Sequence, residues 1–141
     1  MVWWAGDFGL RLSLSPELPA TLAAHLPAAV QSFLGEAVLS VSQVDHWLVH
    51  PGGPKILDAV EDSLDLAKGS LALSRLVLRR FGNMSSPTIL FILQAALEAG
   101  LEGRIMMIAF GPGLTIEMVL VEIDGPGGKI LRGPRVTGGD R

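Results

Sequence analysis

The chain has 141 residues, no cysteine and a formal net charge of −3 at pH 7. This length suits one domain with a substantial core, and the absence of cysteine excludes disulfides and thiolate zinc sites and fits a reducing, cytoplasmic compartment. Lysines and arginines are scattered, so we expect no nucleic-acid partner. Hydrophobic residues make up 49% of the chain and the mean hydropathy is +0.45. That composition indicates either a large core or apolar faces that await a partner.

The first predicted elements are a strand and a long helix. Apolar and polar residues alternate over residues 10–14, which predicts a half-buried strand. Residues 15–17, Ser-Pro-Glu, have the N-cap, early proline and acidic first turn of a helix start. Apolar residues then recur at helical spacing over residues 22–34. Pro27 lies inside this pattern and predicts a break or a kink, because proline has no N–H to donate.

The middle of the chain predicts a buried strand and two helices. Residues 46–49 form a short apolar run that we interpret as a strand ending at His50. Pro54 begins an amphipathic helix that we expect to end at Gly69, and residues 71–80 predict a second helix. We expect the acidic residues of the first helix to lie on one solvated face: Asp58, Glu61, Asp62 and Asp65.

The last predicted elements are one helix and a strand pair. A helix is expected from Thr88 to about Ala99, and because residues 89–93 are apolar all round, we expect it to be buried on most sides. Residues 104–110 and 114–123 are β-like runs joined by Gly-Pro-Gly, which favours an antiparallel pair. Alternation of strands and helices therefore predicts an α/β layered domain.

We expect this domain to span residues 1–123 and the Gly/Pro/Arg-rich tail, residues 124–141, to be loose. The most apolar stretch, residues 105–123, is interrupted by Gly-Pro-Gly and contains Glu117, so we expect no membrane partner. The N-terminus has no basic segment followed by an apolar stretch and does not resemble a signal peptide.

Three runs place glycine or proline beside residues capable of chemistry. His50 follows a predicted strand, where site residues of α/β folds gather, and an imidazole can donate a hydrogen bond to a developing oxyanion. A structural histidine is the alternative. The amide of Asn83 can donate to the same oxygen, although Gly-Asn is also common where helices end. The third run is a hairpin turn or a pocket wall. The runs are His50-Pro51-Gly52-Gly53-Pro54, Gly82-Asn83-Met84-Ser85-Ser86 and Phe110-Gly111-Pro112-Gly113-Leu114.

Together, these runs resemble the C-terminal part of type III polyketide synthases, the chalcone and stilbene synthase family. Residues 47–57 resemble the histidine motif of that family, and residues 81–86 resemble its asparagine motif. Residues 110–117 are similar to its closing loop and strand, and residues 6–16 to the strand and turn that open this half in bacterial members. The resemblance covers about residues 3–123.

The resemblance implies a thiolase-like fold, in which a β-α-β-α-β-β half with a mixed sheet and packed helices is duplicated. This chain would be the second half. The resemblance further implies that His50 and Asn83 bind the malonyl thioester carbonyl and stabilise the enolate formed on decarboxylation, while a cysteine of the first half carries the acyl chain. The implied substrates are coenzyme A thioesters, with no covalently bound cofactor and no metal.

The same resemblance implies an N-terminal, cysteine-bearing half as the partner. Because this chain has no cysteine, we expect it to have no polyketide synthase activity alone. We also expect it to form a homo-oligomer, such as a dimer, through the bare apolar face. Two other functions stay open. One is a non-catalytic, stand-alone assembly or binding domain. The other is half of a ketoacyl synthase III-like enzyme, whose histidine is typically followed by Gln-Ala-Asn rather than by Pro-Gly-Gly.

Further site positions carry over from the family pattern. Leu12 falls where plant members place a gatekeeping phenylalanine, which leaves the product type open. Lys55 lies at the mouth of the implied coenzyme A tunnel, and a plain surface lysine is the alternative. The implied substrate-pocket residues are Leu12, Ser85, Phe110, Gly111 and Pro112, and the implied coenzyme A-binding residues are Gly52, Gly53 and Lys55.

Overall fold

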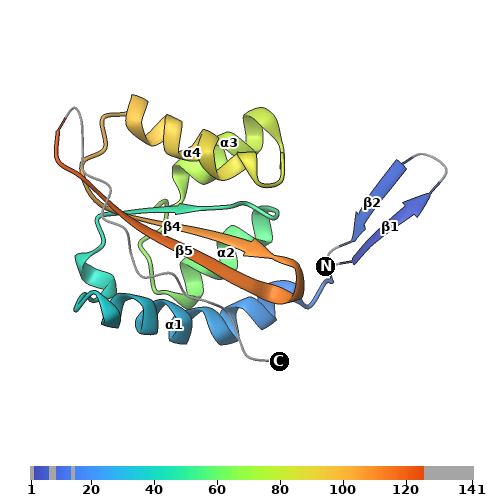
Figure 1. Cartoon of the computed structure of the whole chain (residues 1–141), viewed down its shortest axis with the longest axis horizontal. Helices are drawn as coiled ribbons and strands as arrows, with labels where there is room; N and C mark the ends of the chain where they lie inside the picture. Colours follow the sequence, from blue (N-terminus) through green and yellow to red (C-terminus); the bar gives the residue numbers. More distant parts are fainter. Residues whose placement is uncertain (1, 7–8, 14, 126–141) are drawn as a thin grey trace.

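The computed structural model describes residues 2–6, 9–13 and 15–125 (Figure 1). In this part of the chain, a three-stranded sheet carries helices on both faces, and a separate two-stranded hairpin precedes it. Residues 126–141 of the tail that we expect to be loose lie outside the described residues. The elements are β1 (Val2–Gly6), β2 (Gly9–Ser13), α1 (Leu18–Glu36), η1 (Val41–Gln43), β3 (His46–Val49), α2 (Pro54–Ser63), α3 (Ala72–Phe81), α4 (Pro87–Glu98), β4 (Gly103–Gly111), η2 (Pro112–Leu114) and β5 (Thr115–Ile123).

The three-stranded sheet is mixed, with the order β3-β4-β5. β3 runs parallel to β4, with His46 opposite Ile105 and Val49 opposite Ile108, whereas β5 runs antiparallel to β4. Because parallel strands need a crossover connection, the chain passes through α2, α3 and α4 between β3 and β4. This arrangement confirms the predicted α/β class, the strand at residues 46–49 and the antiparallel pair.

β1 and β2 form a sheet of their own, paired antiparallel from Val2 opposite Ser13 to Gly6 opposite Gly9. β2 confirms the strand predicted near residues 10–14. β1 was not predicted, because its sequence, Val-Trp-Trp-Ala-Gly, lacks the alternation of apolar and polar residues that marks a half-buried strand.

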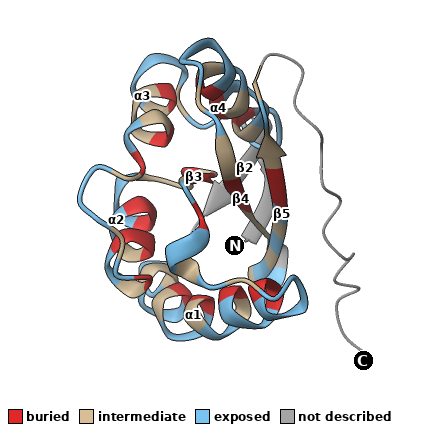
Figure 2. Cartoon of the chain, turned by 90° about the vertical axis from the view of Figure 1, so that its left-hand side faces the viewer, coloured by how far each residue is buried: buried red, intermediate tan, exposed pale blue. Residues whose placement is uncertain are grey.

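Two hydrophobic clusters fill the space on the two faces of the sheet. Along β3, Trp47 and Val49 belong to the cluster under α1 and α2, whereas Leu48 belongs to the cluster under α3 and α4. Successive side chains of a strand point to opposite faces, so this alternation is what a strand buried on both sides requires. Figure 2 shows buried residues on the sides of α1, α2 and α4 that face the strands.

α1 differs from the prediction at Pro27 and at its start. The helix is continuous from Leu18 to Glu36 with Pro27 inside it, so it does not break at the proline, and the alternative of a kink there stays a prediction. Leu22, Leu26 and Val30 are fully buried before and after the proline, and this continuous apolar stripe holds the chain helical although one hydrogen bond is missing. At its start, α1 begins at Leu18 with Glu17 as the N-cap residue, so the predicted N-cap at Ser15 is wrong. The Oγ of Ser15 instead accepts the N–H of Glu17, before the helix, at 3.2 Å.

α2 ends at Ser63, six residues before the predicted end at Gly69. Asp65 takes the left-handed conformation, with φ 50°, in place of the predicted glycine. The N–H of Leu66 then donates to the carbonyl of Glu61 at 2.9 Å, which is the closing bond of a Schellman motif. The aspartate tolerates this conformation better than most residues, which explains why no glycine is needed here.

α4 confirms the helix predicted over residues 88–99 but not its burial. Thr88, Ile92 and Ala96 form one stripe that is fully buried against the sheet. On the rest of the helix, Leu90 is 62% exposed and Leu97 is 53% exposed. The expectation of burial on most sides is therefore wrong for the described part of the chain, because the sheet covers only one side of the helix.

Glu61 does not lie on a solvated face of α2, so the predicted solvated acidic face is wrong for this residue. Its side chain is buried, and its Oε1 accepts the N–H of Leu71 at 3.1 Å. Its Oε2 accepts a hydrogen bond from Arg75 of α3 at 2.7 Å, and Arg75 also pairs with the exposed Asp58 at 2.8 Å. Glu61 therefore joins α2 to the start of α3 by one hydrogen bond to the backbone and one ion pair.

We expect Glu61→Ala to lower the free energy of unfolding by about 2 kcal/mol, because it leaves the amide of Leu71 and the guanidinium of Arg75 without this acceptor. Asp58→Ala is the matched control. The carboxylate of Asp58 is exposed, so its loss should cost only about 0.5 kcal/mol. Urea unfolding followed by tryptophan fluorescence measures both, and equal losses in the two variants would contradict the role of Glu61.

Candidate active site

His50 lies directly after β3, at the end of the parallel pairing. The backbone N–H of His50 donates to the carbonyl of Ile108 at 2.8 Å, which extends the hydrogen bonding between β3 and β4 by one residue beyond the strand. The carbonyl of His50 accepts the N–H of Gly52 at 3.1 Å, and Pro51 between them is buried. The backbone on both sides of the imidazole is therefore held in place.

The glycines after His50 connect the strand to α2. A Cβ on Gly52 would lie 3.2 Å from Cγ1 of Ile56, a core residue of α2, so the close packing of this turn favours glycine. Gly53 is the N-cap residue of α2, with an extended backbone, and Pro54 begins the helix. Lys55 follows in the first turn with an exposed side chain. The binding of coenzyme A by these residues stays a prediction.

The imidazole of His50 is half-buried, and burial lowers its pKa from the ordinary value of 6.5. Desolvation disfavours the charged form of the ring. At neutral pH the ring is therefore uncharged and has one N–H to donate and one nitrogen to accept. A neutral donor of this kind is suited to a carbonyl oxygen whose negative charge grows during a reaction.

We expect the free energy of unfolding to decrease as the pH falls below 6.5, the ordinary pKa of histidine. The pKa of His50 is lowered in the folded chain, so the unfolded chain takes up the proton first and protonation favours unfolding. This contribution is fully present above the unfolded pKa and is lost as the pH falls through the folded pKa.

Urea unfolding from about pH 7.5 to about pH 5 measures this effect. His50→Gln should remove its part of the pH dependence, whereas His25→Gln, at an exposed position of α1, should leave that part in place. An unchanged pH profile in His50→Gln would show that His50 does not carry the effect.

Asn83 lies in the connection between α3 and α4, and its side chain is exposed. Gly82, with φ 73°, ends α3. The Oδ1 of Asn83 accepts the N–H of Ser85 at 2.8 Å, a local turn that orients the side-chain amide. Because the oxygen is engaged in this bond, the NH₂ group is the part of the amide that can serve a ligand as a donor.

Two further features hold the Asn83 loop. Ser85 takes the left-handed conformation, with φ 63°, and its side chain is exposed. The N–H of Met84 donates to Oγ1 of the fully buried Thr88 at 2.9 Å, which anchors the loop to the first turn of α4. The loop geometry is therefore determined by α4 as well as by α3.

The structure places the His50 and Asn83 loops on elements that pack together. Leu48 belongs to the cluster under α3 and α4. His50 lies two residues further along, so by the alternation of a strand its side chain lies on the same face of the sheet as Leu48. Met84, next to Asn83, packs against the same cluster. Among residues 15–125, no hydrogen bond joins the side chains of His50 and Asn83, and their convergence on one atom stays a prediction.

The third run joins β4 to β5. Gly111 pairs with Thr115, and a Cβ on Gly111 would collide with the Oγ1 of Thr115. Pro112 begins η2, and Phe110 is half-buried and packs against the cluster under α1 and α2. Phe110 thus belongs to the opposite cluster from Met84, so the structure does not place it beside the Asn83 loop.

Leu12 lies in β2, opposite Trp3 in the separate hairpin. Ser85 is part of the Asn83 loop. The assignment of Leu12 and Ser85, together with Phe110, Gly111 and Pro112, to a substrate pocket therefore stays a prediction.

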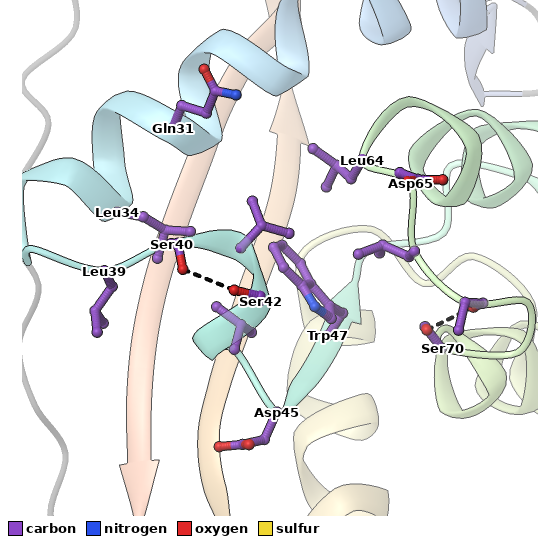
Figure 3. Close-up of a pocket in the computed structure, with 14 residues that line it drawn as sticks. Gln31, Leu34, Leu39, Ser40, Ser42, Asp45, Trp47, Leu64, Asp65 and Ser70 are labelled. Carbon is purple, nitrogen blue, oxygen red and sulfur yellow. Dashed lines mark hydrogen bonds between the residues drawn. The ribbon is translucent and has the colours of Figure 1, made fainter.

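A cavity of about 700 Å³ lies at the other end of β3, away from His50 (Figure 3). Trp47 lies in the middle of the residues that line it, with Asp45 and Leu64 on either side. None of the predicted site residues lines this cavity. It was not predicted, because its lining comes from the α1–β3 and α2–α3 connections, which no sequence motif brings together.

No group of three or more His, Asp or Glu side chains in residues 2–6, 9–13 and 15–125 could hold a metal ion. No helix in the same residues has the length and apolar character to cross a membrane.

The family model described as "Chalcone and stilbene synthases, C-terminal domain" matches residues 5–123. The chain belongs to this family. Its sequence is 34% identical over 119 residues to the alpha-pyrone synthesis polyketide synthase-like Pks18 of Mycobacterium tuberculosis, a match that covers 82% of this chain and 30% of the relative. It is also 34% identical over 127 residues to Polyketide synthase 37 of Dictyostelium discoideum, covering 84% of this chain and 4% of that protein.

The fold is similar to the crystal structure of PKS-I from the brown alga Ectocarpus siliculosus, with a TM-score of 0.75 and 32% sequence identity. This match covers 84% of the chain and 34% of the algal protein. The chain thus spans about a third or less of the length of these relatives. These findings confirm the resemblance to the C-terminal domain of type III polyketide synthases and the thiolase-like fold.

Proposed function

We propose that this chain supplies the histidine and asparagine of a decarboxylating, condensing active site of a type III polyketide synthase. The observation that carries the proposal is that two loops, one with His50 and one with Asn83, are each held by hydrogen bonds and lie on elements that pack around one hydrophobic cluster. Family membership supports the same assignment. Each loop presents a neutral hydrogen-bond donor.

In the proposed reaction, both donors bind the thioester carbonyl oxygen of a malonyl unit. As the bond to the carboxylate breaks, carbon dioxide leaves, and the electron pair moves onto the carbonyl oxygen to form an enolate. The ring N–H of neutral His50 and the NH₂ of Asn83 stabilise that charge by about 3 kcal/mol each, which is the stabilisation that a typical oxyanion-hole donor provides. The lowered pKa of His50 suits this role because the ring binds the oxyanion as a neutral donor.

The enolate carbon then attacks the carbonyl of an acyl thioester on the cysteine of the other half. A carbon–carbon bond forms, and the cysteine leaves as a thiolate. This chain has no cysteine to carry the acyl group, so the proposed reaction needs a cysteine-bearing half. Coenzyme A thioesters are the proposed substrates, and the exposed Lys55 in the first turn of α2 is a suitable partner for a phosphate of the carrier.

The exposed face of α3 and α4 supports the need for such a partner. Phe81 is 51% exposed and Phe91 is 39% exposed, and their rings lie 5.4 Å apart between centroids. Leu90 and Leu97 extend this apolar face along α4. Exposed apolar surface of this kind usually marks an interface. We propose that the cysteine-bearing half covers this face, and that two copies of the chain associate through it when that half is absent.

We expect His50→Ala and Asn83→Ala each to lower the rate of condensation by about 100- to 1,000-fold in a complex with a cysteine-bearing half. Each variant removes one of the two donors to the enolate oxygen. The measurement is product formation and carbon dioxide release from malonyl-CoA.

His25→Ala and Gln31→Ala, both at exposed positions of α1, are the matched controls and should retain the wild-type rate. The chain alone should form no product. Product from the chain alone, or wild-type rates in both His50→Ala and Asn83→Ala, would rule out the proposal. Wild-type behaviour of these variants would favour a non-catalytic assembly domain.

We expect Leu90→Ser and Phe91→Ser to weaken self-association of the chain at least about tenfold, because each removes buried apolar area from the proposed interface. Sedimentation equilibrium of the purified chain measures the association constant. Val38→Ser is the control, since Val38 is also exposed but follows α1, away from this face. A wild-type chain that stays monomeric at high concentration would contradict the proposed interface.

A further inference from the structure

The backbone N–H of Val49 lies at an open edge of the sheet. β3 is an edge strand in the order β3-β4-β5. The backbone N–H of His50 points to β4, where it donates to the carbonyl of Ile108. Because amide groups alternate in direction along a strand, the N–H of Val49 points away from β4. Val49 is fully buried, so water cannot satisfy this donor, and a buried unpaired amide is costly.

Ser74 takes the place of a neighbouring strand at this point. Its Oγ accepts the N–H of Val49 at 3.0 Å, and the serine itself is fully buried. Ser74 lies in the first turn of α3, and α3 leads through Gly82 directly to Asn83. Val49 directly precedes His50. In the described part of the chain, this is the hydrogen bond that joins α3 to β3.

The position of Ser74 is itself fixed by α2. The carboxylate of Glu61 accepts the N–H of Leu71, three residues before Ser74, and a hydrogen bond from Arg75, one residue after it. The other contacts between α3 and β3 are apolar and have no preferred direction. A hydrogen bond requires a defined distance and angle, so the serine determines the register between α3 and the end of β3.

We propose that Ser74 is a positioning residue that holds the end of β3, and therefore His50, in register with the helix that leads to Asn83. The effect of Ser74 on catalysis rests on the proposed function, whereas the coupling between the end of β3 and α3 does not. A serine that only satisfied a buried amide would contribute to stability but would not control the surroundings of the His50 ring.

The test is NMR spectroscopy on the purified chain, comparing Ser74→Ala with Val77→Ala. Val77 is buried on the same helix and packs against the same cluster as Leu48, but its side chain makes no hydrogen bond to β3. In Ser74→Ala we expect the Val49 amide to exchange its proton at least about tenfold faster relative to the Leu48 amide, because its acceptor is gone.

The second readout is the titration of the His50 imidazole. Burial lowers the pKa of His50 in the wild-type chain. When the end of β3 loosens in Ser74→Ala, water reaches the ring, and the midpoint should move up toward the ordinary value. Val77→Ala should leave both the Val49 exchange ratio and the His50 midpoint at their wild-type values.

Ser74→Thr keeps the hydroxyl and should retain both wild-type readouts, and it also provides the comparison if Ser74→Ala does not fold. Equal behaviour of Ser74→Ala and Val77→Ala would overturn the proposal. So would a folded Ser74→Thr that loses the wild-type values of both readouts. Full condensing activity in both His50→Ala and Asn83→Ala would remove the proposed function but would not alter these NMR outcomes, so the two failures are distinguishable.

Discussion

The burial of β3 on both faces is the constraint that organises this domain. Four residues must supply side chains to two cores while their backbone pairs with β4 on one edge. The opposite edge carries a buried amide that α3 satisfies through Ser74. Because β3 has no room to slide without turning Trp47 and Leu48 to the wrong faces, the residue after the strand is held in one place. That residue is His50.

The proposed chemistry follows from how the backbone is held rather than from an ion pair or a metal. The backbone N–H of His50 donates to β4, which holds the residue that carries the ring. The side-chain oxygen of Asn83 accepts the N–H of Ser85, which leaves the NH₂ group of that amide to donate to a ligand. The half-buried position of the imidazole keeps it neutral near pH 7. Burial of the ring and the local turn at Asn83 thus prepare the two donors of the proposed site.

The high hydrophobic content of the chain is explained by two different features. Part of it lies in the two cores, which enclose both faces of a small sheet. Another part lies on α3 and α4, where Phe81, Leu90 and Phe91 are exposed. A domain that forms about a third of its relatives has reason to carry such a surface, since the described part of the chain has nothing to cover it.

The sequence by itself determined the α/β class, the two strands of the β4–β5 pair, the strand that directly precedes His50 and the family, because periodicity, glycine-proline turns and local motifs act over a few residues. Tertiary structure alone decided that α1 continues through Pro27, that Glu61 is buried and that α4 is covered on one side. It also decided that Ser74 meets Val49 across 25 residues of chain. These features depend on which elements pack together, and a pattern within one element does not contain that information.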